Sequence, residues 1–309
     1  MTSGGPRVVA FGECMVELSR LPDGGARIGY GGDTLNTAVY MARLGLDVRY
    51  ATALGADPWS EEMRAAWRAE GVGLDLVLGH PTRSPGLYGI RTDARGERSF
   101  TYWRDNSAAR DFFRLPGSET ALAAMAGADV LYLSGISLSL FDAADRARLA
   151  AVAREVRARG GTVAFDPNYR ARNWESPEAA RAAIEALAPA IDIALPTFED
   201  EAALHGDRTP EETIRRWRDL GVDEVVVKTG PDGALVEMDG VIQAIATARV
   251  TPVDTTGAGD SFNAAYLHAR LAGASPPDAA RAGNALAGAV IGHRGAIMDR
   301  RHPCLQAGR

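Results

Sequence analysis

The sequence has 309 residues, of which 46% are hydrophobic and 24% are charged, and its formal net charge is −6. At roughly 150 residues per domain, this length predicts one large or two modest domains with an ample core. The composition argues against disorder and against a nucleic-acid partner, and two cysteines with five scattered histidines offer neither a disulfide framework nor metal-ligand spacing. No stretch approaches the ~18 apolar residues of a membrane span and the N-terminus is no signal peptide, so we expect a cytoplasmic protein that binds no membrane.

The first third of the chain predicts a strand at Val8–Phe11 and a helix at Thr34–Leu44. The helix is indicated by apolar residues at helical spacing and by Gly45 as its stop. Gly86–Arg91 and Arg98–Arg104 are short, aromatic and roughly alternating, with an Asp-Ala-Arg-Gly turn signal between them. They predict a β-hairpin, either an ornament on a sheet edge or a lid over a ligand crevice.

From about residue 128 short apolar runs alternate with longer Ala- and Arg-rich segments. The predicted strands are Val130–Leu133, Thr162–Phe165, Ile191–Leu195 and Glu224–Val227. The predicted helices are Asp142–Arg159, Pro177–Leu187, Gly259–Leu271 and Pro277–Ile291. This alternation favours a doubly wound α/β core around a parallel sheet. We find no linker or repeat, and expect a single domain over residues 1–309.

The strongest motif is the segment Asp254–Asp260, of sequence DTTGAGD, which precedes a predicted helix. Its small residues let a backbone approach a ligand closely, and the N–H groups of the first helical turn suit an anion such as a phosphoryl group. Asp260 could accept a proton from an attacking hydroxyl. The structural alternative is a glycine-rich turn in which Asp254 or Asp260 caps the helix.

The second motif is Gly31–Ala38, of sequence GGDTLNTA. Its glycine pair offers backbone donors, and Asn36 could bind a hydroxylated ligand. The structural alternative is a loop–helix junction capped by Asp33 or Thr34. The sequence contains neither a Walker A motif nor a Rossmann fingerprint after the first strand, so a nucleotide would have to be held differently.

Together the two motifs resemble those of the ribokinase-like (PfkB) carbohydrate kinase family, in the family's order and across essentially the whole chain. The resemblance implies a doubly wound, mainly parallel α/β sheet with a small β lid, here from excursions at about residues 14–31 and 84–105. It also implies phosphoryl transfer from ATP to a sugar hydroxyl with Mg²⁺. By the same resemblance Asp260 is the general base, and Gly257, Ala258 and Gly259 form the anion hole.

Two further segments point to the substrate: Tyr102-Trp103-Arg104 on the hairpin and Asp166–Arg170 after a strand. Two arginines suit a substrate carboxylate, which a guanidinium can bind through two hydrogen bonds. The combination is similar to kinases that phosphorylate 2-keto-3-deoxygluconate at its 6-hydroxyl. The resemblance implies that the substrate is bound by Gly32, Asp33, Asn36, Tyr88, Tyr102, Arg104, Arg170 and Asp260.

The substrate residues also have structural alternatives. The two tyrosines could be a cross-strand pair, Arg104 a solvated strand end, and Arg170 the ion-pair partner of Asp166 or Glu175. A neutral-sugar kinase of the fructokinase or ribokinase type, or a silent sugar-binding protein on the same scaffold, would then be the rival function.

The nucleotide side is less distinct. Lys228–Gly233 resembles the family's K-x-G-x-x-G turn, although its residues alone indicate only a turn that opens a hairpin. The cofactor-binding residues implied are Asn168, Arg170, Lys228, Gly230, Gly233, Gly257 and Gly259. The family's N-x-x-E element has Thr197 and Asp200 in place of its Asn and Glu, so we assign no metal ligand. We also expect a monovalent cation as a further cofactor and a homo-oligomer, dimeric or higher, as the assembled form.

Overall fold

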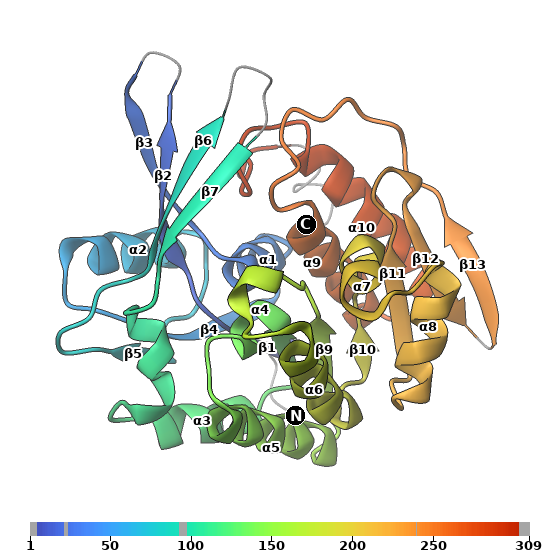
Figure 1. Cartoon of the computed structure of the whole chain (residues 1–309), viewed down its shortest axis with the longest axis horizontal. Helices are drawn as coiled ribbons and strands as arrows, with labels where there is room; N and C mark the ends of the chain where they lie inside the picture. Colours follow the sequence, from blue (N-terminus) through green and yellow to red (C-terminus); the bar gives the residue numbers. More distant parts are fainter. Residues whose placement is uncertain (1–4, 22–23, 93–97, 239, 303–309) are drawn as a thin grey trace.

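The computed structural model describes residues 5–21, 24–92, 98–238 and 240–302 (Figure 1). The strands within them form two sheets, one of nine strands and one of four. The turn predicted at 93–96 lies outside the described residues. No helix in the described part of the chain has the length and apolar content needed to cross a membrane.

The larger sheet has the strand order β13-β12-β11-β10-β9-β8-β1-β4-β5. Its strands are β1 (Arg7–Phe11), β4 (Asp47–Leu54), β5 (Val77–Gly79), β8 (Val130–Ser134), β9 (Thr162–Asp166), β10 (Ile193–Ala194), β11 (Glu224–Lys228), β12 (Ala234–Met238) and β13 (Val241–Ile245). Neighbouring strands pair in parallel from β5 to β11, and β12 and β13 extend the sheet antiparallel. The strand predicted over 191–195 is shorter, because a 3₁₀ turn at Ala188–Ala190 precedes it and Pro196 follows.

Helices cover both faces of this sheet because its buried residues alternate between two cores. Val9 and Phe11 pack in one core, and Val8 and Ala10 pack in the other. The first core includes residues of α3 (Ser118–Ala126), α4 (Gly135–Leu138), α5 (Ala143–Ala158), α6 (Pro177–Leu187), α7 (Phe198–His205) and α8 (Pro210–Asp219). The second includes residues of α1 (Asp33–Arg43), α2 (Pro58–Ala69), α9 (Ala258–Leu271) and α10 (Pro276–Val290). The predicted doubly wound α/β fold is confirmed.

The smaller sheet, which we call the lid sheet, has the order β3-β2-β6-β7. It consists of β2 (Met15–Arg20), β3 (Ala26–Gly31), β6 (Leu87–Thr92) and β7 (Arg98–Trp103), so both predicted excursions supply strands. β2 pairs with β6 in parallel, and the other two pairings are antiparallel. Figure 1 shows the lid sheet standing beyond one edge of the larger sheet, above α1 and α2.

Candidate active site

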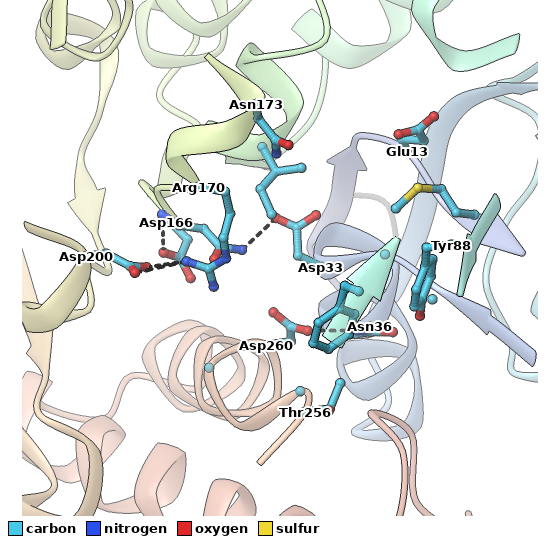
Figure 2. Close-up of a pocket in the computed structure, with 18 of the residues that line it drawn as sticks. Glu13, Asp33, Asn36, Tyr88, Asp166, Arg170, Asn173, Asp200, Thr256 and Asp260 are labelled. Atoms are coloured by element: carbon cyan, nitrogen blue, oxygen red, sulfur yellow. Dashed lines mark hydrogen bonds and ion pairs between the residues drawn. The ribbon is translucent and has the colours of Figure 1, made fainter. Parts of the chain in front are cut away.

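A pocket of about 580 Å³ lies between the lid sheet and the loops at the carboxyl ends of the parallel strands (Figure 2). Open α/β sheets bind ligands at this edge. The predicted site residues that line it are Gly32, Asp33, Asn36, Tyr88, Tyr102, Arg104, Asn168, Arg170, Lys228, Gly257, Ala258, Gly259 and Asp260. Gly230 and Gly233 lie in the turn between β11 and β12, outside this lining.

Asp260 sits in the first turn of α9 and is held from the facing helix α1. The Nδ2 atom of Asn36 donates a 2.8 Å hydrogen bond to Asp260 Oδ2, which Figure 2 shows, and Thr37 donates to the Asp260 carbonyl. Neither helix has a side-chain cap, so the capping roles considered for Asp33, Thr34, Asp254 and Asp260 are wrong. These contacts bring the two sequence motifs into one site.

Burial raises the pKa of Asp260 to about 8. That value already includes the carboxylates of Asp33 and Asp166, which also raise the pKa, and the Asn36 hydrogen bond and Lys228, which lower it. Without ligands the carboxyl group therefore holds its proton near neutral pH. A cationic or metal-neutralised ligand beside it would favour the charged form that a base requires.

Asp260 also makes stability depend on pH. Its folded pKa of about 8 exceeds the ordinary value of 3.8, so its contribution is fully present below about pH 4 and is lost as the pH rises to about 8. Asp260→Asn mimics the protonated form at every pH. We expect its melting temperature to exceed that of the wild type by at least about 3 °C at pH 8.5, with no gain near pH 4. Calorimetry at several pH values measures this; a constant difference would contradict the shifted pKa.

The N-terminus of α9 borders the pocket with its small residues. Gly257 has φ +78°, and a Cβ there would lie 2.7 Å from the Ala296 carbonyl oxygen. A Cβ on Gly259 would lie 3.4 Å from Lys228 Nζ. Gly257 therefore allows a left-handed backbone conformation just before the helix, and Gly259 allows the Lys228 ammonium group to lie close to it. The N–H groups of a first helical turn and a lysine together suit a phosphoryl group.

Lys228 is held in a buried polar cluster at the pocket floor. Its Nζ donates to Asp166 Oδ2 at 2.6 Å and to Asn263 Oδ1 at 3.2 Å. Asn263 in turn donates to Asp166 and to the Tyr132 hydroxyl. Sequence analysis predicted Lys228 but missed Asp166 and Asn263 as site residues, because their partners lie on elements far apart in the chain.

Asp33, the first residue of α1, is hydrogen-bonded to Asn168 in the loop after β9. Asn168 Nδ2 donates to Asp33 Oδ2 at 2.9 Å, and the Ser134 hydroxyl donates to the same oxygen. Burial raises the pKa of Asp33. Asn168 has φ +37°, the one positive φ outside glycine among the described residues, and its N–H donates to Asp166. Its strained backbone turns the loop after β9 into the pocket.

Arg170 forms its ion pair with Asp200. Its Nη1 lies 2.9 and 2.8 Å from the two Asp200 oxygens (Figure 2). The partners considered from the sequence, Asp166 and Glu175, are therefore wrong. Asp200 and Thr197, at the positions of the altered N-x-x-E element, both line the pocket. Asp200 thus fixes the guanidinium at the pocket wall while 42% of the Arg170 side chain stays exposed.

The lid sheet contributes a tyrosine pair that faces the pocket. Tyr88 and Tyr102 are opposite each other in the β6–β7 register, with ring centroids 5.8 Å apart. Tyr88 donates to Glu17 Oε2 at 2.6 Å, and Arg172 donates to the Tyr102 hydroxyl at 2.5 Å from the loop after β9. The cross-strand pair is therefore confirmed, and both residues line the pocket, while their contact with a substrate stays a prediction.

Arg104 is buried, with 8% of its side chain exposed, so the solvated strand end is wrong. It forms an ion pair with Glu13, a pocket residue after β1 that sequence analysis missed. The sequence gives no motif that would identify Glu13 as a site residue, because it lies in the three-residue connection Gly12–Cys14 between β1 and β2. The described pocket lining carries five carboxylates and four cationic side chains.

Residues 6–302 match the model of the pfkB family of carbohydrate kinases. The chain belongs to this family. It is 47% identical over 301 residues to the 2-dehydro-3-deoxygluconokinase of Dickeya dadantii, covering 94% of this chain and 96% of that one. A crystal structure of the 2-dehydro-3-deoxygluconokinase of Thermotoga maritima has a TM-score of 0.84 at 24% identity, with 95% of each chain covered. The fructokinase of Vibrio cholerae O395, bound to fructose, ADP and calcium, has a TM-score of 0.83 at 26% identity, with 98% of each covered.

Proposed function

We propose that this pfkB-family chain transfers the γ-phosphoryl group of ATP to the 6-hydroxyl of 2-keto-3-deoxygluconate, which is another name for 2-dehydro-3-deoxygluconate. The observation that carries the proposal is one pocket in which Asp260, at the N-terminus of α9, shares the lining with Arg104 and Arg170. The carboxylate suits proton removal from a hydroxyl, and the arginines suit the carboxylate of a sugar acid. The 47% identity to a 2-dehydro-3-deoxygluconokinase supports the same substrate.

In the proposed mechanism Asp260 accepts the proton of the attacking hydroxyl. Asn36 holds its carboxylate, and the helix terminus at Gly257–Gly259 would stabilise the negative charge that develops on the transferred group. Lys228 lies beside Gly259 and adds a positive charge there. Because the transition state is loose, positioning and charge neutralisation supply most of the rate. The lid tyrosines would exclude water, the competing acceptor.

The proposed ATP site runs from the N-terminus of α9 past Lys228 to the Gly230–Gly233 turn. A Cβ on Gly233, whose φ is +100°, would lie 2.1 Å from the Ile245 carbonyl oxygen, so the turn packs tightly against the chain after β13. That chain segment, residues 246–250, borders a second hollow of about 400 Å³ against α10. We assign the adenine base of ATP to this hollow. Cofactor contacts of Asn168 and Arg170 stay predictions.

The pocket fits Mg²⁺ only as a partner of the nucleotide. Among the described residues no three His, Cys, Asp or Glu side chains are grouped to hold a metal. Mg²⁺ commonly keeps several waters and binds one or two carboxylates together with substrate phosphates. Asp166, which lines the pocket beside Lys228, is the carboxylate that would hold it. Bound there, the ion would neutralise charge on the phosphates. The monovalent cation stays a prediction.

A neutral-sugar kinase is the second candidate, since the structure also matches a fructokinase. A neutral sugar brings no carboxylate to the two arginines beyond their own partners Glu13 and Asp200, whereas a sugar acid does, which favours the sugar acid. A sugar-binding protein without catalytic activity is disfavoured, because it would have no use for the buried carboxylate of Asp260 at the N-terminus of α9. The proposed function is tested by ³¹P and ¹³C NMR of the product: phosphorus coupling to C6 is expected, and a phosphoryl group on another carbon would contradict it.

We also propose a homodimer formed through the outer face of the lid sheet. The strand register puts Leu18, Ile28 and Trp103 on the face opposite the tyrosine pair, and they are 38%, 49% and 58% exposed. Three apolar side chains on one sheet face are typical of an interface. Trp103→Glu is expected to convert a dimer to a monomer in light scattering. A monomeric wild type at micromolar concentration would contradict the proposal.

A further inference from the structure

Glu13 is a buried carboxylate in the pocket wall, and one of its two oxygens lacks a hydrogen-bond donor. Its side chain is 1% exposed, and Arg104 forms an ion pair with one of its oxygens. That oxygen, Oε2, contacts Arg104 Nη2, whereas Glu13 Oε1 accepts no hydrogen bond from the described residues and Arg104 Nε has no acceptor among them. Buried polar atoms are nearly always hydrogen-bonded, so an unsatisfied pair that lines a pocket indicates a ligand that completes it.

The surroundings hold Glu13 at one end of the pocket. Figure 2 shows it at the end away from Asp260 and Thr256. A Cβ on Gly86 would lie 3.2 Å from Glu13 Oε1 and 3.0 Å from Met15 Cγ, so the carboxylate is packed against the start of the lid sheet. A substrate whose reacting hydroxyl meets Asp260 would therefore present its opposite end to Glu13 and Arg104.

We propose that Glu13 binds the substrate directly, by accepting a hydrogen bond from a hydroxyl next to the carboxylate that Arg104 binds. An ionised carboxylate only accepts hydrogen bonds, and a guanidinium only donates them. The pair is therefore complementary to a ligand that carries an anionic group and an O–H group side by side. Glu13 acts as a specificity-determining residue, and the argument rests on the proposed function.

This complementarity selects one form of the substrate. A 2-keto-3-deoxy acid has no hydroxyl on C3, so the donor beside its carboxylate is the C2 hydroxyl of the ring-closed hemiketal. The ring must close through the oxygen on C5, because the 6-hydroxyl has to stay free for phosphorylation. In the open chain, C2 carries a carbonyl oxygen, an acceptor that would face the acceptor atoms of Glu13. The structure thus assigns the five-membered hemiketal as the bound form.

The test compares 2-keto-3-deoxygluconate with 2,5-anhydro-3-deoxygluconate, which keeps the ring, the carboxylate and the 6-hydroxyl but lacks the C2 hydroxyl. For the wild type we expect kcat/KM to be about 10- to 100-fold lower on the anhydro compound, the scale of a hydrogen bond to a charged group. Glu13→Ala is expected to reduce this difference to within about 3-fold, and Glu13→Gln to reduce it by at least about 5-fold. Glu70→Gln, which breaks an ion pair with Arg43 outside the pocket, should leave the difference unchanged.

Each outcome decides the proposal. If the wild type uses both compounds equally well, or if both Glu13 variants keep its discrimination, Glu13 does not bind the C2 hydroxyl. A role in holding Arg104 alone would lower kcat/KM equally for both compounds. If Glu13→Ala does not fold, the wild type and the isosteric Glu13→Gln variant still supply the comparison. No turnover of 2-keto-3-deoxygluconate by the wild type would overturn the proposed function first.

Discussion

Asp260→Asn is expected to lower kcat for phosphoryl transfer by at least about 100-fold, the usual scale for the loss of a general base. The amide keeps the shape of the carboxylate and can still accept the hydrogen bond of Asn36. It cannot accept the hydroxyl proton. Since the variant relieves a buried carboxyl group of raised pKa, it should stay folded and be more stable than the wild type at alkaline pH. ADP release under saturating substrates measures the loss.

The matched control is Asp278→Asn, which makes the same chemical change on the exposed first turn of α10. It is expected to keep the turnover of the wild type. Near-normal turnover in Asp260→Asn would remove Asp260 from the proposed mechanism, whatever the substrate.

The second large effect is expected for the two pocket arginines. Arg104→Gln and Arg170→Gln should each lower kcat/KM for 2-keto-3-deoxygluconate by about 100-fold, because each removes charged hydrogen bonds to the substrate carboxylate. On fructose the same variants should change kcat/KM by less than about 3-fold. The split between substrates separates lost carboxylate binding from general damage, which would lower both activities together.

Two further variants sharpen this prediction. Arg181→Gln changes an arginine that pairs with Glu178 outside the pocket, and should leave both substrates unaffected. Asp200→Asn removes the ion-pair partner of Arg170 but keeps the guanidinium. We expect a smaller loss from it, seen mainly in KM, because Arg170 would then be positioned less well. Equal losses on sugar acid and fructose in the Arg170 variant would contradict carboxylate binding.

The sequence predicted most of the fold because its signals are local. α1 and α9 begin within one residue of the predicted starts, where a glycine pair and a GAG run precede helical periodicity. In the lid sheet, β6 and β7 were predicted as a hairpin. β2 and β3 were harder to predict as strands, since β3 is half exposed and has no apolar alternation. The short β10 shows the opposite error: a five-residue segment with four apolar side chains predicted a strand, whereas the flanking turns leave a strand of two residues.

Site residues that belong to sequence motifs were predicted. Site residues that reach the pocket only through contacts between distant segments were missed. Asp260 and Asn36 belong to recognisable motifs, and the structure joins them by one hydrogen bond. Glu13 acquires its place only because β1 ends beside the lid sheet, opposite Arg104. Asp200, in the first turn of α7, pairs with Arg170 in the loop after β9, and no spacing in the sequence indicates this pair. Ion pairs between distant segments therefore account for most of what sequence analysis could not supply.

The central claim is that this pfkB-family chain phosphorylates a sugar acid. The most direct measurement is ADP release with Mg²⁺ and ATP, comparing 2-keto-3-deoxygluconate, fructose and ribose at equal concentrations. The account predicts turnover on the keto acid at least about 100-fold above that on either neutral sugar. Comparable or faster turnover on fructose or ribose would contradict the assignment of Arg104 and Arg170 to a substrate carboxylate, while leaving the proposed chemistry of Asp260 intact.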